Sequence, residues 1–140
     1  MSYSLQLQNG DLAVTGGECN IVFGAAKLQQ DMTIWLLTRY QSDRMHPTFG
    51  SVLQNFIGQP MTSPTTTQTN VYNEIMRVLN NYQSMVYQMF QANPNNFSLA
   101  ELPYSIDSIV PSLSFDTIFV TVQVSNPSST AVVTISPSSL

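Results

Sequence analysis

Side chains that could carry out chemistry are few in this chain of 140 residues. It has one histidine, His46, and one cysteine, Cys19. Asp43 and Ser51 lie near His46, so a Ser-His-Asp set can be assembled on paper. With 17 serines in the chain such a set arises by chance, and Ser51 lies in no nucleophile-elbow motif. The sequence therefore predicts no nucleophilic active site.

Glycoside hydrolysis requires two carboxyl groups on either side of the scissile bond, and no such pair is evident. The eight acidic residues are spread along the chain: Asp11, Glu18, Asp31, Asp43, Glu74, Glu101, Asp107 and Asp116. Asp31 is the most interesting, because Trp35 lies one helical turn later and an apolar neighbour favours a protonated acid. The favoured interpretation is a structural carboxylate that pairs with Arg44 or with a backbone group.

Metal, disulfide and phosphate sites lack the residues that they need. One histidine near one carboxylate is a weak metal signal, and a single cysteine excludes an internal disulfide and a cysteine-based zinc site. Cys19 has no basic neighbour in sequence to activate it, so we expect an inert, half-buried thiol. Gly16-Gly17 is too short for a phosphate-binding loop. We expect no catalytic residue, no metal and no cofactor.

Charge is scarce throughout the sequence. Only 9% of the residues are charged, against roughly 25% in a typical soluble domain, and the net charge is −4. Four scattered cations, Lys27, Arg39, Arg44 and Arg77, cannot form the basic stripe that nucleic-acid binding needs. No apolar run reaches the ~18 residues of a membrane span, and the N-terminus lacks a secretory pattern. We expect cytoplasmic synthesis and no binding to nucleic acid or membrane.

Neutral polar residues take the place of the missing charges. Ser, Thr, Asn and Gln together make up 53 of the 140 residues. Surface charge normally keeps monomers apart, whereas a neutral polar surface loses little when a partner covers it. Two long segments, 45–73 and 117–135, carry no charge at all. We therefore expect partners to cover surfaces in these segments.

The elements that must position these residues follow from hydrophobic spacing. Residues 3–14 alternate polar and apolar side chains around Asn9-Gly10, which predicts a β-hairpin. Gly16-Gly17 ends the pattern, and 18–23 fits no single type of element. No internal repeat is evident.

Helical periodicity predicts three helices. The first runs over about 25–38 and has one apolar face: Leu28, Met32, Trp35 and Leu36. A short helix over 51–57 begins at Ser51, whose hydroxyl suits an N-cap. The longest pattern predicts a helix over about 71–90, and the Pro- and Thr-rich segment 58–70 is predicted to be a loop.

The last third of the chain is predicted to be β structure. β-Branched residues alternate in strands 117–124 and 130–135, which a turn at 126–129 joins. An earlier strand near 106–110 is expected to stop at Pro111. The chain, 1–140, is thus predicted to form a single α+β domain. Its elements are an N-terminal β-hairpin, two or three helices including one long helix, and a C-terminal antiparallel β-hairpin.

Several motifs occur in a recognisable order before residue 60. They are Gly10-Asp11-Leu12, Gly16-Gly17, Leu28-Gln29-Gln30-Asp31-Met32, Trp35-Leu36-Leu37-Thr38 and Asp43-Arg44-Met45-His46-Pro47-Thr48-Phe49-Gly50-Ser51-Val52-Leu53. Over residues 5–57 this set resembles the baseplate wedge, or sheath-initiator, family of contractile-tailed bacteriophages. Many members carry a Glu-Pro-Arg motif after the long helix. This chain lacks it, so no role is carried over there.

The resemblance implies structural roles for the matching residues: Asp31, Trp35, Arg44, Pro47, Phe49, Gly50 and Ser51. Pro47 would stiffen a loop, Phe49 would insert into the core and Gly50 would permit a backbone turn. Arg44 would bind Asp31 or a carbonyl at a helix end.

The same resemblance implies a structural component of the virion tail baseplate that assembles in the host cytoplasm. Its partners would be the tail sheath protein and baseplate wedge subunits, with tail tube or hub proteins as further candidates. The C-terminal hairpin, 117–135, would dock the sheath by strand addition, because no charge guards its edge. The residues assigned to this contact are Thr117, Ile118, Phe119, Val120, Thr121, Val122, Gln123, Val124, Val132, Val133, Thr134 and Ile135.

Other interpretations stay open. Some members of the family have been labelled lysozymes, so peptidoglycan cleavage is the alternative function. A free-standing binding module is a third possibility. The C-terminal hairpin could also be fully paired inside its own domain.

Overall fold

The computed structural model describes residues 3–8, 11–56, 64–96, 102, 105–113, 118–125 and 130–135. Six short strands come first: β1 (Ser4–Leu5), β2 (Leu7–Gln8), β3 (Asp11–Leu12), β4 (Val14–Thr15), β5 (Glu18–Cys19) and β6 (Ile21–Val22). The helical elements are α1 (Gly24–Leu37), the 3-10 turn η1 (Leu53–Phe56), α2 (Pro64–Ala92) and the 3-10 turn η2 (Pro94–Asn96). Three longer strands follow: β7 (Ser105–Leu113), β8 (Ile118–Ser125) and β9 (Thr130–Ile135).

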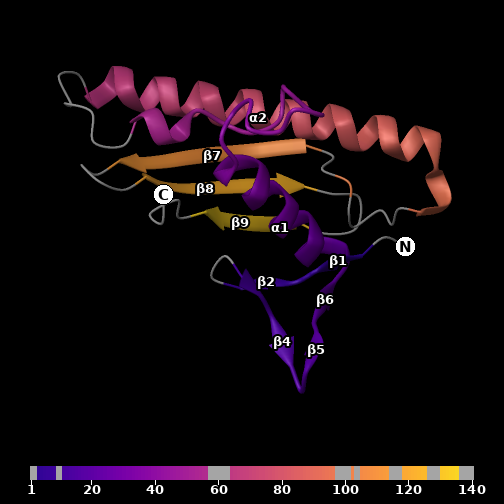
Figure 1. Ribbon diagram of the computed structural model, residues 1–140. Helices are drawn as coiled ribbons and strands as arrows, with labels where there is room; N and C mark the ends of the chain where they lie inside the picture. The colour runs from indigo at the N-terminus through magenta and orange to yellow at the C-terminus, as the bar shows by residue number, and fades with distance from the viewer. Residues whose placement is uncertain are drawn as a thin grey trace.

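This order of elements confirms the predicted α+β fold, with antiparallel strands at both ends and one long helix. α2 runs along β7, and α1 crosses the sheet closer to β9 (Figure 1). The core lies between the two helices and one face of the sheet. All four residues on the predicted apolar face of α1 are buried: Leu28, Met32, Trp35 and Leu36. They pack with the apolar stripe of α2 and with alternate residues of β8: Ile118, Val120, Val122 and Val124.

The long helix begins at Pro64, earlier than predicted. Proline suits the first turn of a helix, because the N–H that it lacks has no intrahelical partner there. The hydroxyl of Thr69 donates to the carbonyl of Thr65 (2.9 Å) within this first part. The side-chain amide of Gln68 donates to the carbonyl of Pro111 on β7 (3.2 Å). The Thr-rich start of α2 is therefore helical although its own helix propensity is low, and Gln68 links it to the sheet.

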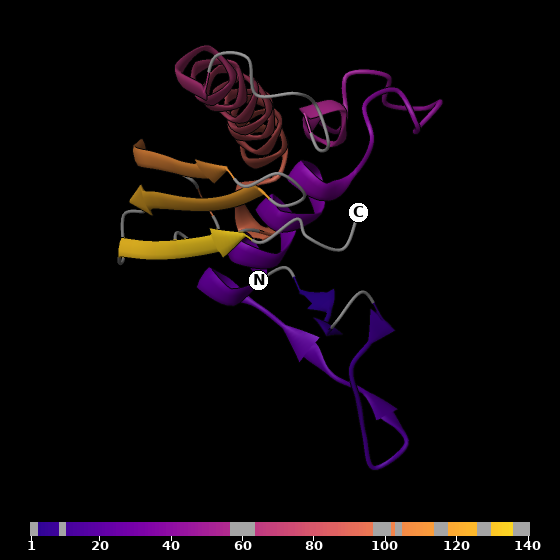
Figure 2. The same cartoon turned by 90° about the vertical axis from the view of Figure 1, so that its left-hand side faces the viewer.

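The six N-terminal strands form three antiparallel pairs that meet at a hub. β2 pairs with β3, β4 pairs with β5, and β6 returns to pair with β1. A ring of three backbone hydrogen bonds joins Gln6, Ala13 and Asn20, each of which donates its N–H and accepts on its C=O, over 2.8 to 2.9 Å. This N-terminal unit, residues 3–22, extends away from the helices and the sheet (Figures 1 and 2).

The N-terminal unit corrects two sequence predictions. Its hub residues are seven positions apart, so the unit is an internal repeat, and residues 18–23 contain the strands β5 and β6. The sequence carries the same period of seven in its glycines, Gly10, Gly17 and Gly24, and in its apolar residues at 5, 12, 19 and 7, 14, 21. The hairpin predicted over 3–14 is confirmed only where β2 pairs with β3, because Leu5 pairs with Ile21 and Val14 with Cys19; its Asn9-Gly10 connection lies outside the described residues.

The C-terminal sheet has the order β7-β8-β9, so the predicted hairpin is confirmed and β7 is added to it. The expected stop at Pro111 is wrong, because β7 continues to Leu113. The nitrogen and the carbonyl of a strand residue face the same edge, and the Pro111 carbonyl accepts from Gln68 of α2. The proline nitrogen therefore faces away from β8, and no hydrogen bond between the strands is lost.

Candidate functional site

The strand predicted to receive the sheath, β8, is the central strand of the sheet. Residues 120–125 of β8 pair with β7 on one side and with β9 on the other. The assigned residues of β8, from Ile118 to Val124, therefore do not form a free edge as predicted, because β7 or β9 already uses their backbone groups. Thr117 lies outside the described residues.

β7 and β9 are the two edge strands of the sheet, and of these only β9 contains residues assigned to the sheath contact. Among the described residues, β9 pairs with β8 alone, so its other backbone edge meets no strand. Four of the assigned residues lie in this strand: Val132, Val133, Thr134 and Ile135. The residues assigned to the sheath contact thus lie in two strands. β8 is a central strand, and only β9 has backbone N–H and C=O groups along an edge that no described strand pairs with.

Ser51 lies at a junction between three segments and is fully buried. Its hydroxyl donates to the carbonyl of Leu36 in the last turn of α1 (2.6 Å) and accepts a long hydrogen bond from the N–H of Leu53 (3.4 Å). Its backbone N–H donates to Thr38, and its carbonyl accepts from Tyr40. The helix predicted to begin at Ser51 is a 3-10 turn whose first carbonyl acceptor is Val52, so Ser51 precedes the N-cap position and mainly satisfies a carbonyl at the end of α1.

The motif loop before Ser51 turns sharply at Pro47 and Gly50. Gly50 has φ +95°, and a Cβ there would lie 2.6 Å from the carbonyl oxygen of Thr38. Pro47 occupies the second position of a turn closed by the N–H of Phe49 and the carbonyl of His46 (3.0 Å). Only glycine fits where the loop passes against the end of α1.

Two charged residues of α2 fasten this loop to the long helix. The carboxylate of Glu74 accepts the N–H of Val52 (2.9 Å) and binds Arg77, which also donates to the carbonyl of Gly50 (3.3 Å). The Arg77 guanidinium lies over the Tyr40 ring, 4.9 Å from its centroid.

Burial raises the pKa of Glu74, but the hydrogen bonds from Arg77 and Val52 outweigh burial and hold this pKa below its ordinary value. Sequence reasoning did not single out either residue. A signal was present, because Glu74 and Arg77 are the only charged residues of α2 and lie three positions apart.

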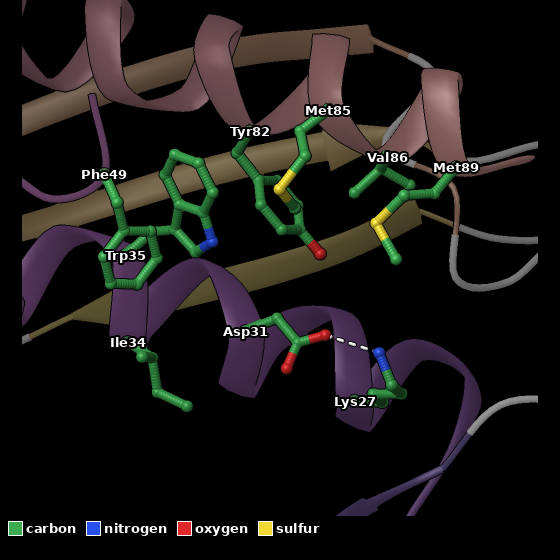
Figure 3. Close-up of a pocket in the computed structure, with 9 residues that line it drawn as sticks. All are labelled: Lys27, Asp31, Ile34, Trp35, Phe49, Tyr82, Met85, Val86 and Met89. Atoms are coloured by element: carbon green, nitrogen blue, oxygen red, sulfur yellow. Dashed lines mark hydrogen bonds and ion pairs between the residues drawn. The ribbon is translucent and has the colours of Figure 1, made fainter. Parts of the chain in front are cut away.

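The aromatic side chains near this junction line a groove between α1 and α2 (Figure 3). The Trp35 ring meets the rings of Phe49 and Tyr82 edge to face, with centroids 4.5 and 5.5 Å apart. Phe49 is half-buried against the core, as the motif predicted. The groove encloses about 200 Å³, and Lys27 and Asp31 lie at its α1 side.

Asp31 has a different partner from the one predicted. Its carboxylate binds Lys27, one turn earlier on α1, over 2.6 Å. Arg44 is exposed and has no ion-pair partner among the described residues. The spacing of four along a helix brings Lys27 and Asp31 onto one face, and this local contact prevails over the longer one to the loop. The predicted partner of Asp31, Arg44 or a backbone group, is therefore wrong, because Asp31 binds Lys27.

The one acid–histidine pair lies at the surface. Nδ1 of His46 is 3.0 Å from a carboxylate oxygen of Asp43. Hydrogen bonds from His46 and from the N–H of Met45 hold the pKa of Asp43 below its ordinary value. Ser51 cannot complete a triad, because its hydroxyl is buried and bound to the Leu36 carbonyl.

Cys19 is exposed and not half-buried as expected. No group of three potential metal ligands occurs among the described residues. None of the helices in the described part of the chain is both long and apolar enough to cross a membrane.

Comparisons with known protein families, with curated proteins and with solved structures found no match to this chain.

Proposed function

We propose that this chain is a structural component of a contractile phage-tail baseplate. In this role it packs with wedge subunits and initiates tail-sheath assembly by accepting a strand from the sheath protein. The motif resemblance over residues 5–57 supports the proposal. Residues of the motif, among them Trp35, Gly50 and Ser51, join the end of α1 to the loop and to η1 by buried contacts. A stiff junction suits a subunit that must transmit load.

The observation that carries strand addition is the uncharged edge strand. β9 pairs on one side only among the described strands, and residues 117–135 contain no charged side chain. Edges that must stay unpaired are usually guarded by lysine or another charge. Each added backbone hydrogen bond contributes about 0.5–1.5 kcal/mol net. Repetition around a ring of subunits would make these modest contacts cooperative.

A pair of proline variants in β9 tests this role. Adjacent residues of a strand direct their N–H groups to opposite edges. One of the two variants, Val132→Pro or Val133→Pro, therefore loses an N–H that faces β8. The other variant loses an N–H that faces the outer edge of the sheet. Thermal unfolding identifies the outward variant as the more stable of the two.

The readout is polymerisation of the purified tail-sheath protein, followed by light scattering and electron microscopy. We expect the outward variant to keep its fold and to lose nucleation of the sheath. Nucleation at the wild-type rate by this folded variant would refute strand addition at β9. A wild-type chain that neither nucleates the sheath nor binds wedge subunits would refute the baseplate function itself.

Peptidoglycan cleavage is distinguished by a turbidity assay on bacterial cell walls. Asp31 is bound to Lys27, and Glu18 is an exposed residue at the end of an N-terminal strand pair. We expect no clearing by the wild-type chain. Clearing that Asp31→Asn or Glu18→Gln abolishes would establish an enzyme instead.

A further inference from the structure

Gln30 of α1 binds the N-terminal unit at a position that the unit repeats. Its side-chain amide donates to the carbonyl of Leu5 (2.8 Å) and accepts the N–H of Leu7 (2.9 Å). These two residues flank Gln6, which directs its own N–H and C=O inward to the hub. One carboxamide therefore binds two backbone groups on the outer edge of the unit, on either side of a hub residue.

The same pair of backbone groups recurs at the other two hub residues. Neighbouring residues of a strand direct their backbone groups to opposite edges. Since Ala13 and Asn20 also use both groups in the hub, the residues that flank them direct theirs outward. We call each outward pair, a C=O before a hub residue and an N–H after it, an edge notch. The second notch consists of the C=O of Leu12 and the N–H of Val14, and the third of the C=O of Cys19 and the N–H of Ile21.

The register of the strand pairs agrees with this assignment. Leu7 lies opposite Leu12, and Val14 lies opposite Cys19. Each of these pairs is one step from two hub residues that are hydrogen-bonded to one another. Because bonded and non-bonded pairs alternate along an antiparallel ladder, the strands do not use the backbone groups of the flanking residues.

Two of the three notches are open. Within the described part of the chain, no hydrogen bond reaches the C=O of Leu12 or Cys19, or the N–H of Val14 or Ile21. Val14 and Ile21 are 57% and 54% exposed, and Cys19 is exposed as well. The unit projects from the helices and the sheet in both views (Figures 1 and 2), so a partner has access to both open notches.

The occupied notch shows which chemistry fits the open ones. A primary carboxamide has a donor and an acceptor side by side, so one Asn or Gln side chain satisfies both groups of a notch. A carboxylate lacks the donor for the C=O, and an ammonium group lacks the acceptor for the N–H. In a second copy of this chain Gln30 is already bound to that copy's own unit, which favours a different chain as the occupant.

We propose that the notches at Ala13 and Asn20 bind Asn or Gln carboxamides of a different protein chain, which attaches to the N-terminal unit as α1 does through Gln30. The unit would then hold α1 at one outer edge and the partner at the two others. This contact does not involve β9, and it does not depend on strand addition or on the baseplate function.

Propionamide, which has the same amide group as a Gln side chain, is the first probe. The full-length, isotope-labelled chain is titrated with it, and backbone groups are followed by NMR. We expect saturable shifts of the Val14 and Ile21 amide protons. The Leu7 amide should respond only in Gln30→Ala, which opens the third notch. N,N-dimethylpropionamide, which has no N–H, should need about a two- to tenfold higher concentration, because one of the two hydrogen bonds is lost.

A matched pair of proline variants localises the contact. Val14→Pro and Ile21→Pro each remove the outward N–H of one notch, where proline costs no hydrogen bond between strands. In Val14→Pro the carbonyl of Leu12 should lose its response to propionamide while the Ile21 amide keeps its own. In Ile21→Pro the carbonyl of Cys19 should lose its response while the Val14 amide keeps its own. The retained response shows that each variant folds.

A soluble alanine-rich helix with one central Gln extends the test to a protein segment. We expect it to reproduce the shifts at Val14 and Ile21, and its counterpart with Met in place of Gln to produce none. Absence of saturable shifts, equal responses to the two small amides, or a response to propionamide but not to the Gln helix would overturn the proposal. Shifts that grow with the concentration of the chain alone would overturn it in favour of a second copy.

Discussion

The guanidinium of Arg77 donates to both carboxylate oxygens of Glu74, over 2.6 and 2.9 Å. Both residues lie on α2, yet each also binds backbone of the motif loop, at Val52 and Gly50 respectively. The pair therefore links two parts of the chain more than 20 residues apart in sequence. Its loss would free the loop from the long helix.

The first prediction concerns Glu74→Gln. The folded-state pKa of Glu74 lies below its ordinary value of 4.5, so its carboxylate stabilises the fold above that pH. This stabilisation is lost as the pH falls through the folded-state pKa. We expect Glu74→Gln to lower the free energy of unfolding by about 1.5–3 kcal/mol at neutral pH. The difference from wild type should shrink below pH 4.5.

Urea unfolding at a series of pH values measures this effect. Glu18→Gln, which changes an exposed carboxylate, is the control and should alter the free energy of unfolding by less than about 0.5 kcal/mol at neutral pH. A Glu74→Gln deficit that stays constant down to acid pH would contradict the assigned ion pair.

The second prediction compares two glycines with positive φ. Gly50 and Gly17 have φ +95° and +87°, but only at Gly50 would a Cβ meet backbone atoms within 3 Å. Gly17→Ala should cost about 1–2 kcal/mol for the left-handed backbone alone. Gly50→Ala should cost clearly more in denaturant unfolding, because the carbonyls of Thr38 and Arg39 must move. Equal losses would show that the close packing at Gly50 carries no energetic weight.

The third prediction concerns the buried hydroxyl of Ser51. Ser51→Ala leaves the carbonyl of Leu36 without this donor, and we expect a loss of about 1–3 kcal/mol in the free energy of unfolding. Ser84→Ala, at an exposed position of α2, should change it by less than about 0.5 kcal/mol. Thermal unfolding of both variants measures the contrast. An unchanged free energy of unfolding in Ser51→Ala would mean that the junction relaxes around the lost hydrogen bond.

The fourth prediction concerns the attachment of the N-terminal unit to α1. The side-chain amide of Gln30 accepts the N–H of Leu7 (2.9 Å) and donates to the carbonyl of Leu5 (2.8 Å), as a neighbouring strand would. Gln30→Ala should therefore speed hydrogen exchange of the Leu7 amide. Gln29→Ala, at the exposed neighbouring position, should leave that exchange unchanged. Unaltered exchange in Gln30→Ala would place the anchor of the unit elsewhere.

The sequence predicted the elements whose signals are local. The face of α1 that contains Leu28 and Leu36 follows from the helical period, and the roles of Gly50 and Ser51 follow from backbone geometry at a turn. The start of α2 could not be predicted, because a Thr-rich segment has low helix propensity and its one link to the sheet, from Gln68 to Pro111, joins residues far apart in sequence.

Contacts between distant residues account for the other differences. β8 is a central strand because β7 pairs with it. β7 continues past Pro111, whose carbonyl accepts a hydrogen bond from the neighbouring helix and not from β8. Glu74 and Arg77 act on a loop that no periodic pattern connects to α2. The N-terminal repeat did leave a signal in the sequence, because glycine recurs every seven residues at Gly10, Gly17 and Gly24, but a period of seven is neither the strand period nor the helix period.

The register shift in β7 has a consequence for how its sequence can vary. Ile106 and Ile109 are an odd number of residues apart, which in an uninterrupted strand would place them on opposite faces. Both nevertheless contact the core, because Asp107 forms a β-bulge that adds one residue between them. The bulge is bound by the hydroxyls of Ser105 and Ser125. A relative that lacked Asp107 would keep this core only if the apolar residues on one side of the deletion moved by one position. The length of β7 and the alternation of its apolar residues must therefore change together.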